Sequence, residues 1–189
     1  MAILDSSVIE SMGFAGVGEN VFISDRASFY NCSNISLGHN VRIDDFCVLS
    51  AGVGGIYIGN YVHIAVYSSL IGAGKITISD FCNISSRVTI YSSSDDFSGS
   101  TMSNPMVLSE YTGVRHADVF FGKHVIVGSG SVILPGVTLE DGVAVGSLSL
   151  IKEDCYAFCI YAGSPAKFIK ERKRDLLKLE EAFLANLGQ

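Results

Sequence analysis

Hydrophobic residues recur every six positions between Phe121 and Cys155. The first place of each hexad is large and apolar, at Phe121, Val127, Ile133, Leu139, Val145 and Ile151, and the fifth is small or apolar, at Val125, Ser131, Val137, Val143, Ser149 and Cys155. In a helix of 3.6 residues per turn these positions would not form one stripe. An even repeat keeps the same side of every strand facing inward. The pattern therefore predicts very short strands with a bend in each hexad.

Glycines fall where those bends are expected. They occupy the second place, at Gly122, Gly128 and Gly146, or the fourth place, at Gly130, Gly136 and Gly142. We expect positive φ angles there, which glycine adopts without steric cost. An array of this kind is typical of a parallel β-helix, in which three hexads close one coil of about eighteen residues. A β-sandwich would have longer strands without a fixed step.

A related phrase recurs in the first two thirds of the chain. It appears at residues 35–41, 56–62, 76–82 and 119–125, with starts 21, 20 and 43 residues apart. The spacing predicts a coil domain over residues 17–163, interrupted by one excursion over residues 92–118. Long excursions from compact repeats are usually functional or disordered, and the aromatic and acidic residues of this one favour function.

The two ends of the chain differ from the coil. Residues 1–16 carry a short apolar set that we expect to cap the first coil and cover its exposed β-edge. Residues 164–189 are predicted to form a C-terminal helix, with Ser164 as N-cap, Pro165 at the first helical position and apolar residues such as Leu176 and Phe183 at turn spacing.

Composition narrows the class of protein. A net charge of −6 argues against general nucleic-acid binding, although six of the 13 basic residues lie within residues 167–178 and suggest a small polyanion as ligand. No apolar run is long enough for a membrane span, and the N-terminus lacks the pattern of a signal peptide, so we expect a soluble cytoplasmic protein. Five cysteines without paired spacing favour free thiols.

The hexad array and the ending Ala162-Gly163-Ser164-Pro165-Ala166-Lys167 resemble the hexapeptide-repeat acyltransferases, in particular their sugar O-acetyltransferase branch. The resemblance implies a left-handed parallel β-helix, a homotrimer with active sites between adjacent subunits, and acetyl-CoA as co-substrate in a groove between two coils. It places the cofactor-binding residues at Gly128, Ser129, Gly146 and Ser147 for the pantetheine, at Lys152 and Ala162 for the adenine end, and at Lys167 and Lys170 for the phosphates.

Acyl transfer to a hydroxyl requires a base, and histidine is well suited near neutral pH. We predict His63 as the base, with Asp95 or Asp96 as its orienting partner or as a substrate ligand; many family members have their catalytic histidine where this chain has these two aspartates. His116 is the second candidate for the base. The predicted acceptor-binding residues are His116, Arg87 and Tyr91. His39 and His124 lie near corners and are expected to be exposed turn residues. Without a poised histidine, substrate positioning would serve an amine acceptor better than a hydroxyl.

The main functional prediction is an acetyl-CoA-dependent O-acetyltransferase that modifies a sugar in surface-polysaccharide biosynthesis. The alternative is an N-acetyltransferase acting on an amino-sugar nucleotide, whose phosphates would find few basic residues in the coil. A zinc hydrolyase on the same coil needs a close histidine pair, and His116 and His124 are eight positions apart, so no metal is expected. A non-catalytic coil is the remaining alternative, against which the C-terminal basic cluster argues.

Overall fold

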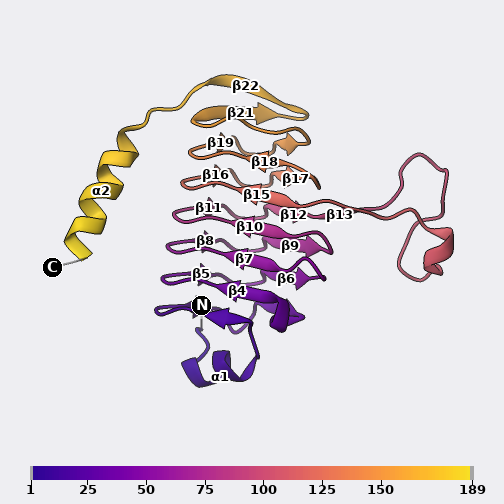
Figure 1. Ribbon diagram of the computed structural model, residues 1–189, viewed down its shortest axis with the longest axis horizontal. Helices are drawn as coiled ribbons and strands as arrows, with labels where there is room; N and C mark the ends of the chain where they lie inside the picture. The colour runs from indigo at the N-terminus through magenta and orange to yellow at the C-terminus, as the bar shows by residue number, and fades with distance from the viewer. Residues whose placement is uncertain (1, 188–189) are drawn as a thin grey trace.

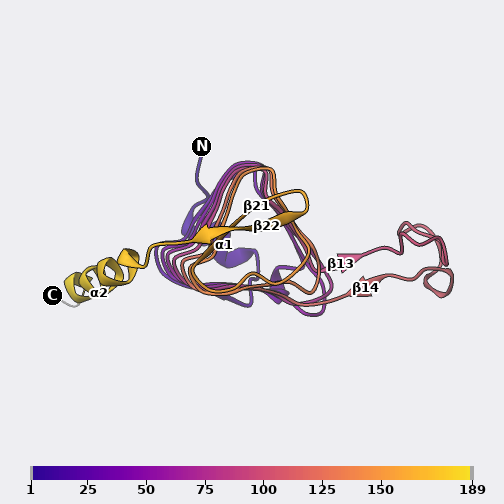
Figure 2. The ribbon, with the colours of Figure 1, turned by 90° about the horizontal axis from the view of Figure 1, so that it is seen from above.

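Three parallel sheets form the walls of a triangular prism, and each coil of the chain passes through them in turn (Figures 1 and 2). The structure is a computed structural model and describes residues 2–187. The first sheet contains β1 (Gly16–Val17), β4 (Ile35–Leu37), β7 (Ile56–Ile58), β10 (Ile76–Ile78), β15 (Val119–Phe121) and β18 (Thr138–Leu139). The second contains β2 (Phe22–Ile23), β5 (Arg42–Ile43), β8 (His63–Ile64), β11 (Asn83–Ile84), β16 (Ile126–Val127), β19 (Ala144–Val145), β21 (Cys159–Gly163) and β22 (Ala166–Glu171). The third contains β3 (Ser28–Tyr30), β6 (Val48–Ala51), β9 (Ser69–Gly72), β12 (Thr89–Tyr91), β17 (Val132–Ile133) and β20 (Leu150–Ile151).

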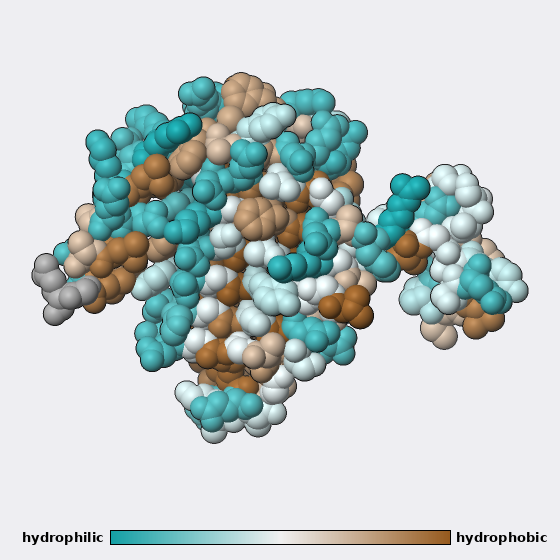
Figure 3. Space-filling model, in the orientation of Figure 1, coloured by the Kyte–Doolittle hydropathy of each residue, from teal (hydrophilic) through white to brown (hydrophobic). Residues whose placement is uncertain are grey.

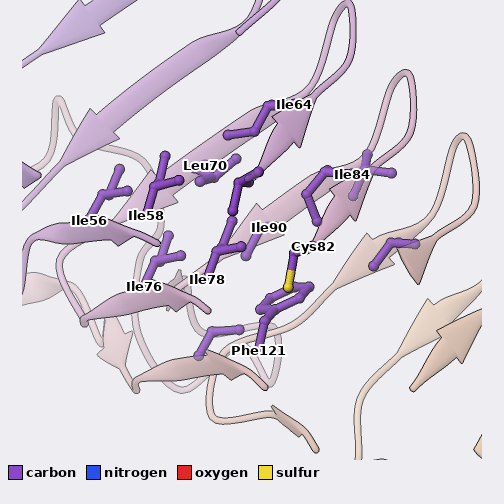
Figure 4. Close-up of a cluster of buried hydrophobic side chains, with 14 of the residues drawn as sticks. Ile56, Ile58, Ile64, Leu70, Ile76, Ile78, Cys82, Ile84, Ile90 and Phe121 are labelled. Carbon is purple, nitrogen blue, oxygen red and sulfur yellow. The ribbon is translucent and has the colours of Figure 1, made fainter. Parts of the chain in front are cut away.

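The hexad pattern accounts for the core. Every first-place and fifth-place residue between Phe121 and Cys155 is at most 4% exposed. Isoleucines of successive coils stack directly on one another, as in the pairing of Ile56 with Ile76 and of Ile58 with Ile78 (Figure 4). Because each strand contributes one or two inward side chains per coil, the interior is a column of aliphatic layers. The predicted inward direction of these positions is confirmed.

The glycines serve two purposes, of which the sequence predicted one. The fourth-place residues Gly130, Gly136 and Gly142 have positive φ angles, as expected. The second-place glycines do not. A Cβ atom at Gly128 would lie 2.5 Å from the backbone nitrogen of Ser147, so this glycine is required by the close approach of two coils. The expectation of positive φ at the second place was wrong for that reason.

The excursion leaves the corner between the third and first sheets and extends away from the prism (Figures 1 and 3). Its base is an antiparallel pair, β13 (Ser93–Ser94) and β14 (Arg115–His116), and a 3-10 turn covers Ser109–Tyr111; a second 3-10 turn, Cys32–Asn34, precedes β4. Phe97 and Met106 are both 92% exposed at its outer end. Such exposure of large apolar side chains is typical of a surface that meets another molecule.

The N-terminal segment lies beneath the first coil. Helix α1 (Ser6–Ser11) buries Ile9 against the core, and Leu4 donates its backbone N–H to the carbonyl of Ile23 in β2 at 2.9 Å. These contacts cover the lowest apolar layer of the prism, which would otherwise face water.

The C-terminal segment corrects the prediction of a helix over residues 164–189. Ser164 and Pro165 form the turn of a hairpin, Ala166–Glu171 pairs antiparallel with β21, and α2 spans Asp175–Leu187; residues 188 and 189 lie outside the described part. The Ser-Pro signal was overridden because β21 ends the second sheet and would leave its backbone groups unpaired. No helix within residues 2–187 is long and apolar enough to cross a membrane.

Candidate functional site

A hydrogen-bonded cluster surrounds His63 on the outer face of the second sheet. Parallel register places Arg42 on one side of His63 and Asn83 on the other. The Nε2 atom of His63 lies 2.9 Å from Asp44 Oδ2, and its Nδ1 atom lies 3.2 Å from Asn83 Oδ1. Arg42 donates from Nε to the other oxygen of Asp44 at 2.7 Å. Both ring nitrogens of His63 therefore already have a partner.

Asp44 is the orienting partner of His63, not Asp95 or Asp96. Burial alone would raise the pKa of Asp44, but hydrogen bonds from Arg42 and His63 lower it below its ordinary value. Asp44 is thus held as a carboxylate beside the imidazole. The sequence missed it because one coil step here is 20 or 21 residues, which brings position 44 next to position 63 only after the chain has wound once around the prism.

The two aspartates of the excursion have separate surroundings. Asp96 accepts hydrogen bonds from the backbone N–H groups of Ser98 and Thr101 at 2.8 and 2.9 Å, and these bonds lower the pKa of its carboxyl group. It therefore holds a turn of the excursion. Asp95 is exposed directly after β13, and no hydrogen bond to its carboxylate is found within residues 2–187. Neither aspartate contacts His63 within one chain, because β13 leaves from the corner opposite the second sheet (Figure 2).

The three predicted acceptor-binding residues divide between two corners. Tyr91 ends β12 and His116 lies in β14, so both stand at the base of the excursion, where His116 Nδ1 is 2.7 Å from the Ser93 hydroxyl. Arg87 stands instead at the corner between the second and third sheets, over the ring of Tyr67 at 5.6 Å. One chain does not bring all three to a single pocket.

The predicted cofactor residues fall into a row and a cavity. Gly128, Gly146 and Ala162 follow the buried residues of β16, β19 and β21, and they continue a row on the second sheet that begins with Asp44 and Ser85. A Cβ atom at Gly146 would lie 2.9 Å from that of Ala162, so the upper part of the row is flat and narrow. Ser129 and Ser147 are exposed beside it.

A cavity of about 520 Å³ lies at the C-terminal end of the coil. Lys152 and Lys167 both line it, together with the aromatic side chains of Tyr156 and Phe168. Lys170 lies further along β22, opposite Ile160, and is exposed outside the cavity. The two lysines and the rings suit a ligand that carries both phosphates and an aromatic base. Within residues 2–187, no group of three or more His, Cys, Asp or Glu side chains could hold a metal ion.

Comparison with known proteins identifies close relatives. The chain is 62% identical over 183 residues to a dTDP-4-amino-4,6-dideoxy-D-glucose acyltransferase of Escherichia coli, which covers 97% of this chain and 95% of the relative. It is 44% identical to the N-acyltransferase AntD of Bacillus cereus in complex with dTDP and 3-hydroxybutyryl-CoA, with a TM-score of 0.95 over 99% of this chain and 98% of AntD. No family model matches the sequence.

The predicted O-acetyltransferase branch is represented by a more distant relative. A putative lipopolysaccharide biosynthesis O-acetyl transferase, WbbJ of Escherichia coli K12, is 27% identical over 85% of this chain and 81% of its own length. The relatives therefore confirm acyl transfer and the left-handed β-helix, and they favour the alternative acceptor, an amino-sugar nucleotide, over a sugar hydroxyl. The chain belongs to the hexapeptide-repeat acyltransferases.

Proposed function

We propose that the protein is an N-acyltransferase that moves an acyl group from a coenzyme A thioester to the amino group of a dTDP-linked 4-amino-4,6-dideoxyhexose. The observation that carries this proposal is the 62% identity to an acyltransferase of that acceptor over nearly the whole chain. AntD, in complex with dTDP-4-amino-4,6-dideoxyglucose and coenzyme A, supports it with 44% identity and a TM-score of 0.94. This acceptor replaces the sugar hydroxyl as the substrate class.

The coenzyme A thioester is assigned to the upper half of the prism. Its adenine and phosphates would lie in the cavity with Lys152 and Lys167, and its pantetheine would follow the flat row past Ala162, Gly146 and Gly128. Small residues allow a thin ligand to approach the backbone. The thioester would then reach the level of Ser85, the next residue of the row.

Two variants of AntD direct attention to the reacting centre. Its structures include variants at a serine and at an aspartate ten positions later. This chain has the same spacing at Ser85 and Asp95 and again at Ser86 and Asp96. Because the carboxylate of Asp96 already accepts bonds from Ser98 and Thr101, we assign Ser85 and Asp95.

The reaction would proceed by attack of the amine nitrogen on the thioester carbonyl. The new N–C bond forms, the C–S bond breaks, Asp95 takes the proton from nitrogen, and the coenzyme A thiolate leaves and is protonated from solvent. The hydroxyl of Ser85 would donate to the carbonyl oxygen as negative charge develops there. His63 has both ring nitrogens engaged, so we assign it to holding the acceptor and not to proton transfer.

A site of this kind needs two copies of the chain. Ser85 lies on the second sheet, whereas Asp95 projects from the opposite corner (Figure 2). We therefore propose a trimer in which the excursion of one subunit reaches the second sheet of the next. Coexpression of Ser85→Ala and Asp95→Asn chains should restore part of the activity that each variant lacks alone. Full inactivity of the mixed oligomer would contradict the shared site.

The acceptor class is tested by turnover. Purified protein should release free thiol from acetyl-CoA in the presence of dTDP-4-amino-4,6-dideoxyglucose, with an acetylated product by mass spectrometry, and should release none with dTDP-glucose, which offers only hydroxyls. Turnover of dTDP-glucose without turnover of the amine would overturn the proposal.

The assignment of Asp95 is tested by substitution. Asp95→Asn should lower kcat by roughly 10²–10⁴-fold, the contribution of a general base. His63→Ala should act mainly on the KM of the acceptor. The matched control is Glu110→Gln, which removes an exposed carboxylate from the same excursion and should leave kcat within about twofold. Normal kcat in Asp95→Asn would end the assignment.

A further inference from the structure

We propose that a column of four side chains at the corner between the second and third sheets binds the nucleoside diphosphate of the acceptor. The arginine column consists of Arg26, Phe46, Tyr67 and Arg87, one residue from each of four successive coils. This inference rests on the proposed function, because it names the subsite for the dTDP part of that acceptor. It adds Arg26, Phe46 and Tyr67, which no sequence pattern had singled out.

The column is continuous and has a cation at each end. The rings of Phe46 and Tyr67 stack with centroids 4.9 Å apart and an interplanar angle of 15°. The Arg26 guanidinium carbon lies 5.7 Å from the centre of the Phe46 ring, and that of Arg87 lies 5.6 Å from the centre of the Tyr67 ring. Cation–π attraction therefore holds both guanidinium groups in fixed positions at the surface.

The backbone under the column is unusual for these residues. Phe46, Tyr67 and Arg87 have φ angles of 62°, 62° and 61°, in the left-handed region that large side chains rarely adopt. In the next coil, the same position is occupied by Gly130, which adopts this conformation without cost. Three consecutive large residues where glycine suffices indicate that the side chains themselves are needed here.

The two guanidinium groups lack protein acceptors. Within residues 2–187, neither Arg26 nor Arg87 makes a side-chain hydrogen bond or an ion pair. The other arginines nearby are engaged, since Arg42 binds Asp44 and Arg172 donates to two backbone carbonyls. Asp45, close to the column, bonds the Ser24 hydroxyl. In a chain of net charge −6, two exposed arginines without a carboxylate are suited to an anion from outside.

The position of the column fits the acceptor and not the donor. Arg87 is two residues after Ser85, level with the proposed reacting centre, and the column descends from there toward the N-terminal coils. The donor is assigned to the coils above Ser85. An acceptor whose amino group meets the thioester at that level must extend its diphosphate downward, past Arg87 first and toward Arg26. Three strand steps of about 4.8 Å give the column a length suited to an extended nucleotide.

Calorimetry with dTDP alone tests the column without depending on acyl transfer. Arg87→Gln and Arg26→Gln should each weaken dTDP binding by about tenfold, the loss of a hydrogen bond to a charged group. Thymidine, which has no phosphate, should bind weakly and be little affected by Arg87→Gln. The matched control is Lys75→Gln, which removes a cation seated 4.7 Å from the Tyr57 ring at a different corner and should leave dTDP binding unchanged.

The outcomes separate the two proposals. If the wild-type protein acetylates the amino-sugar nucleotide and both arginine variants bind dTDP within about twofold of wild type, the function stands and the column is overturned. If wild type binds dTDP and the arginine variants do not, but no amine is acetylated, the column stands and the reaction is wrong. Failure of wild type to bind dTDP overturns the column directly. Thermal unfolding of each variant confirms that it is folded.

Discussion

Two corners of the prism carry stacked aromatic columns, and the chain treats them differently. At the corner between the first and second sheets, Tyr61, Phe81 and His124 stack at 5.0 Å per step, nearly parallel. Helix α2 covers this column with Phe183, whose ring meets Tyr61 edge-on at 5.2 Å. The arginine column has the same left-handed backbone but no cover. The chain shields the column that is apolar and leaves exposed the one that has unpaired cations.

Electrostatic contacts fix α2 on its column. Glu180 lies 2.7 Å from His124 Nε2 and 3.6 Å from Lys123 Nζ, and the side chains of His124 and Glu180 are only 12% and 14% exposed. His124 was expected to be an exposed turn residue; the expectation was wrong because α2 returns along this corner (Figure 1). The covered column is therefore a structural joint between the coil and its C-terminal helix.

The largest expected difference between the columns is in stability. Phe81→Ala removes the middle ring of the covered column and should lower the free energy of unfolding by about 2–3 kcal/mol, near the low end for buried phenylalanine. Phe46→Ala should lower it by less than about 1 kcal/mol, because this ring is 42% exposed. Thermal midpoints followed by circular dichroism measure both, and equal losses would show that cover by α2 contributes nothing.

The core could be predicted from the sequence because it depends only on a local period. An inward residue every six positions identifies Val127, Ile133 and Leu139 without knowledge of any coil length. The pairing of His63 with Asp44 requires that length, and insertions at the corners change it from eighteen to 20 or 21 residues. Reading the chain at this longer step finds the arginine column as well, since its members are 20, 21 and 20 residues apart.

The C-terminal hairpin and the shared site could not be predicted in the same way. Ser164 and Pro165 are a sound local signal for a helix start, but the unpaired edge of β21 is a property of the completed coil. The separation of Asp95 from His63 likewise follows from which corner the excursion leaves. Local patterns do not report which side of the prism a residue reaches.

A smaller effect concerns the joint alone and depends on pH. Hydrogen bonding to His124, followed by the charges of His124 and Lys123, lowers the pKa of Glu180 against the opposing effect of burial. A carboxyl group whose pKa is lower in the folded state stabilises the fold above its unfolded pKa of about 4.3, and this contribution is lost as the pH falls through the folded value.

Glu180→Gln should therefore lower stability at neutral pH by about 1 kcal/mol, the typical worth of one such hydrogen bond at a partly exposed site. The difference between wild type and variant should shrink as the pH is taken below about 4. Glu181→Gln, which removes the exposed neighbouring carboxylate, is the control and should show neither change. Thermal midpoints as a function of pH test this, and a difference that stays constant down to low pH would contradict the role of the charge.

The smallest effect tests the comparison most directly, because the covered corner also has a cation on an aromatic ring. Arg174 lies 4.6 Å from the centre of the Phe158 ring, in the coil above His124, and Phe158 is only 8% exposed. If cations at this corner serve only to join the C-terminal segment to the coil, Arg174→Ala should cost about 0.5 kcal/mol, a drop of about 1–2 °C in Tm, without changing dTDP affinity. Arg87→Gln should do the reverse, with unchanged Tm and weaker dTDP binding. An Arg174 variant that loses dTDP affinity, or an Arg87 variant that loses only stability, would show that the two columns do not divide support and binding between them.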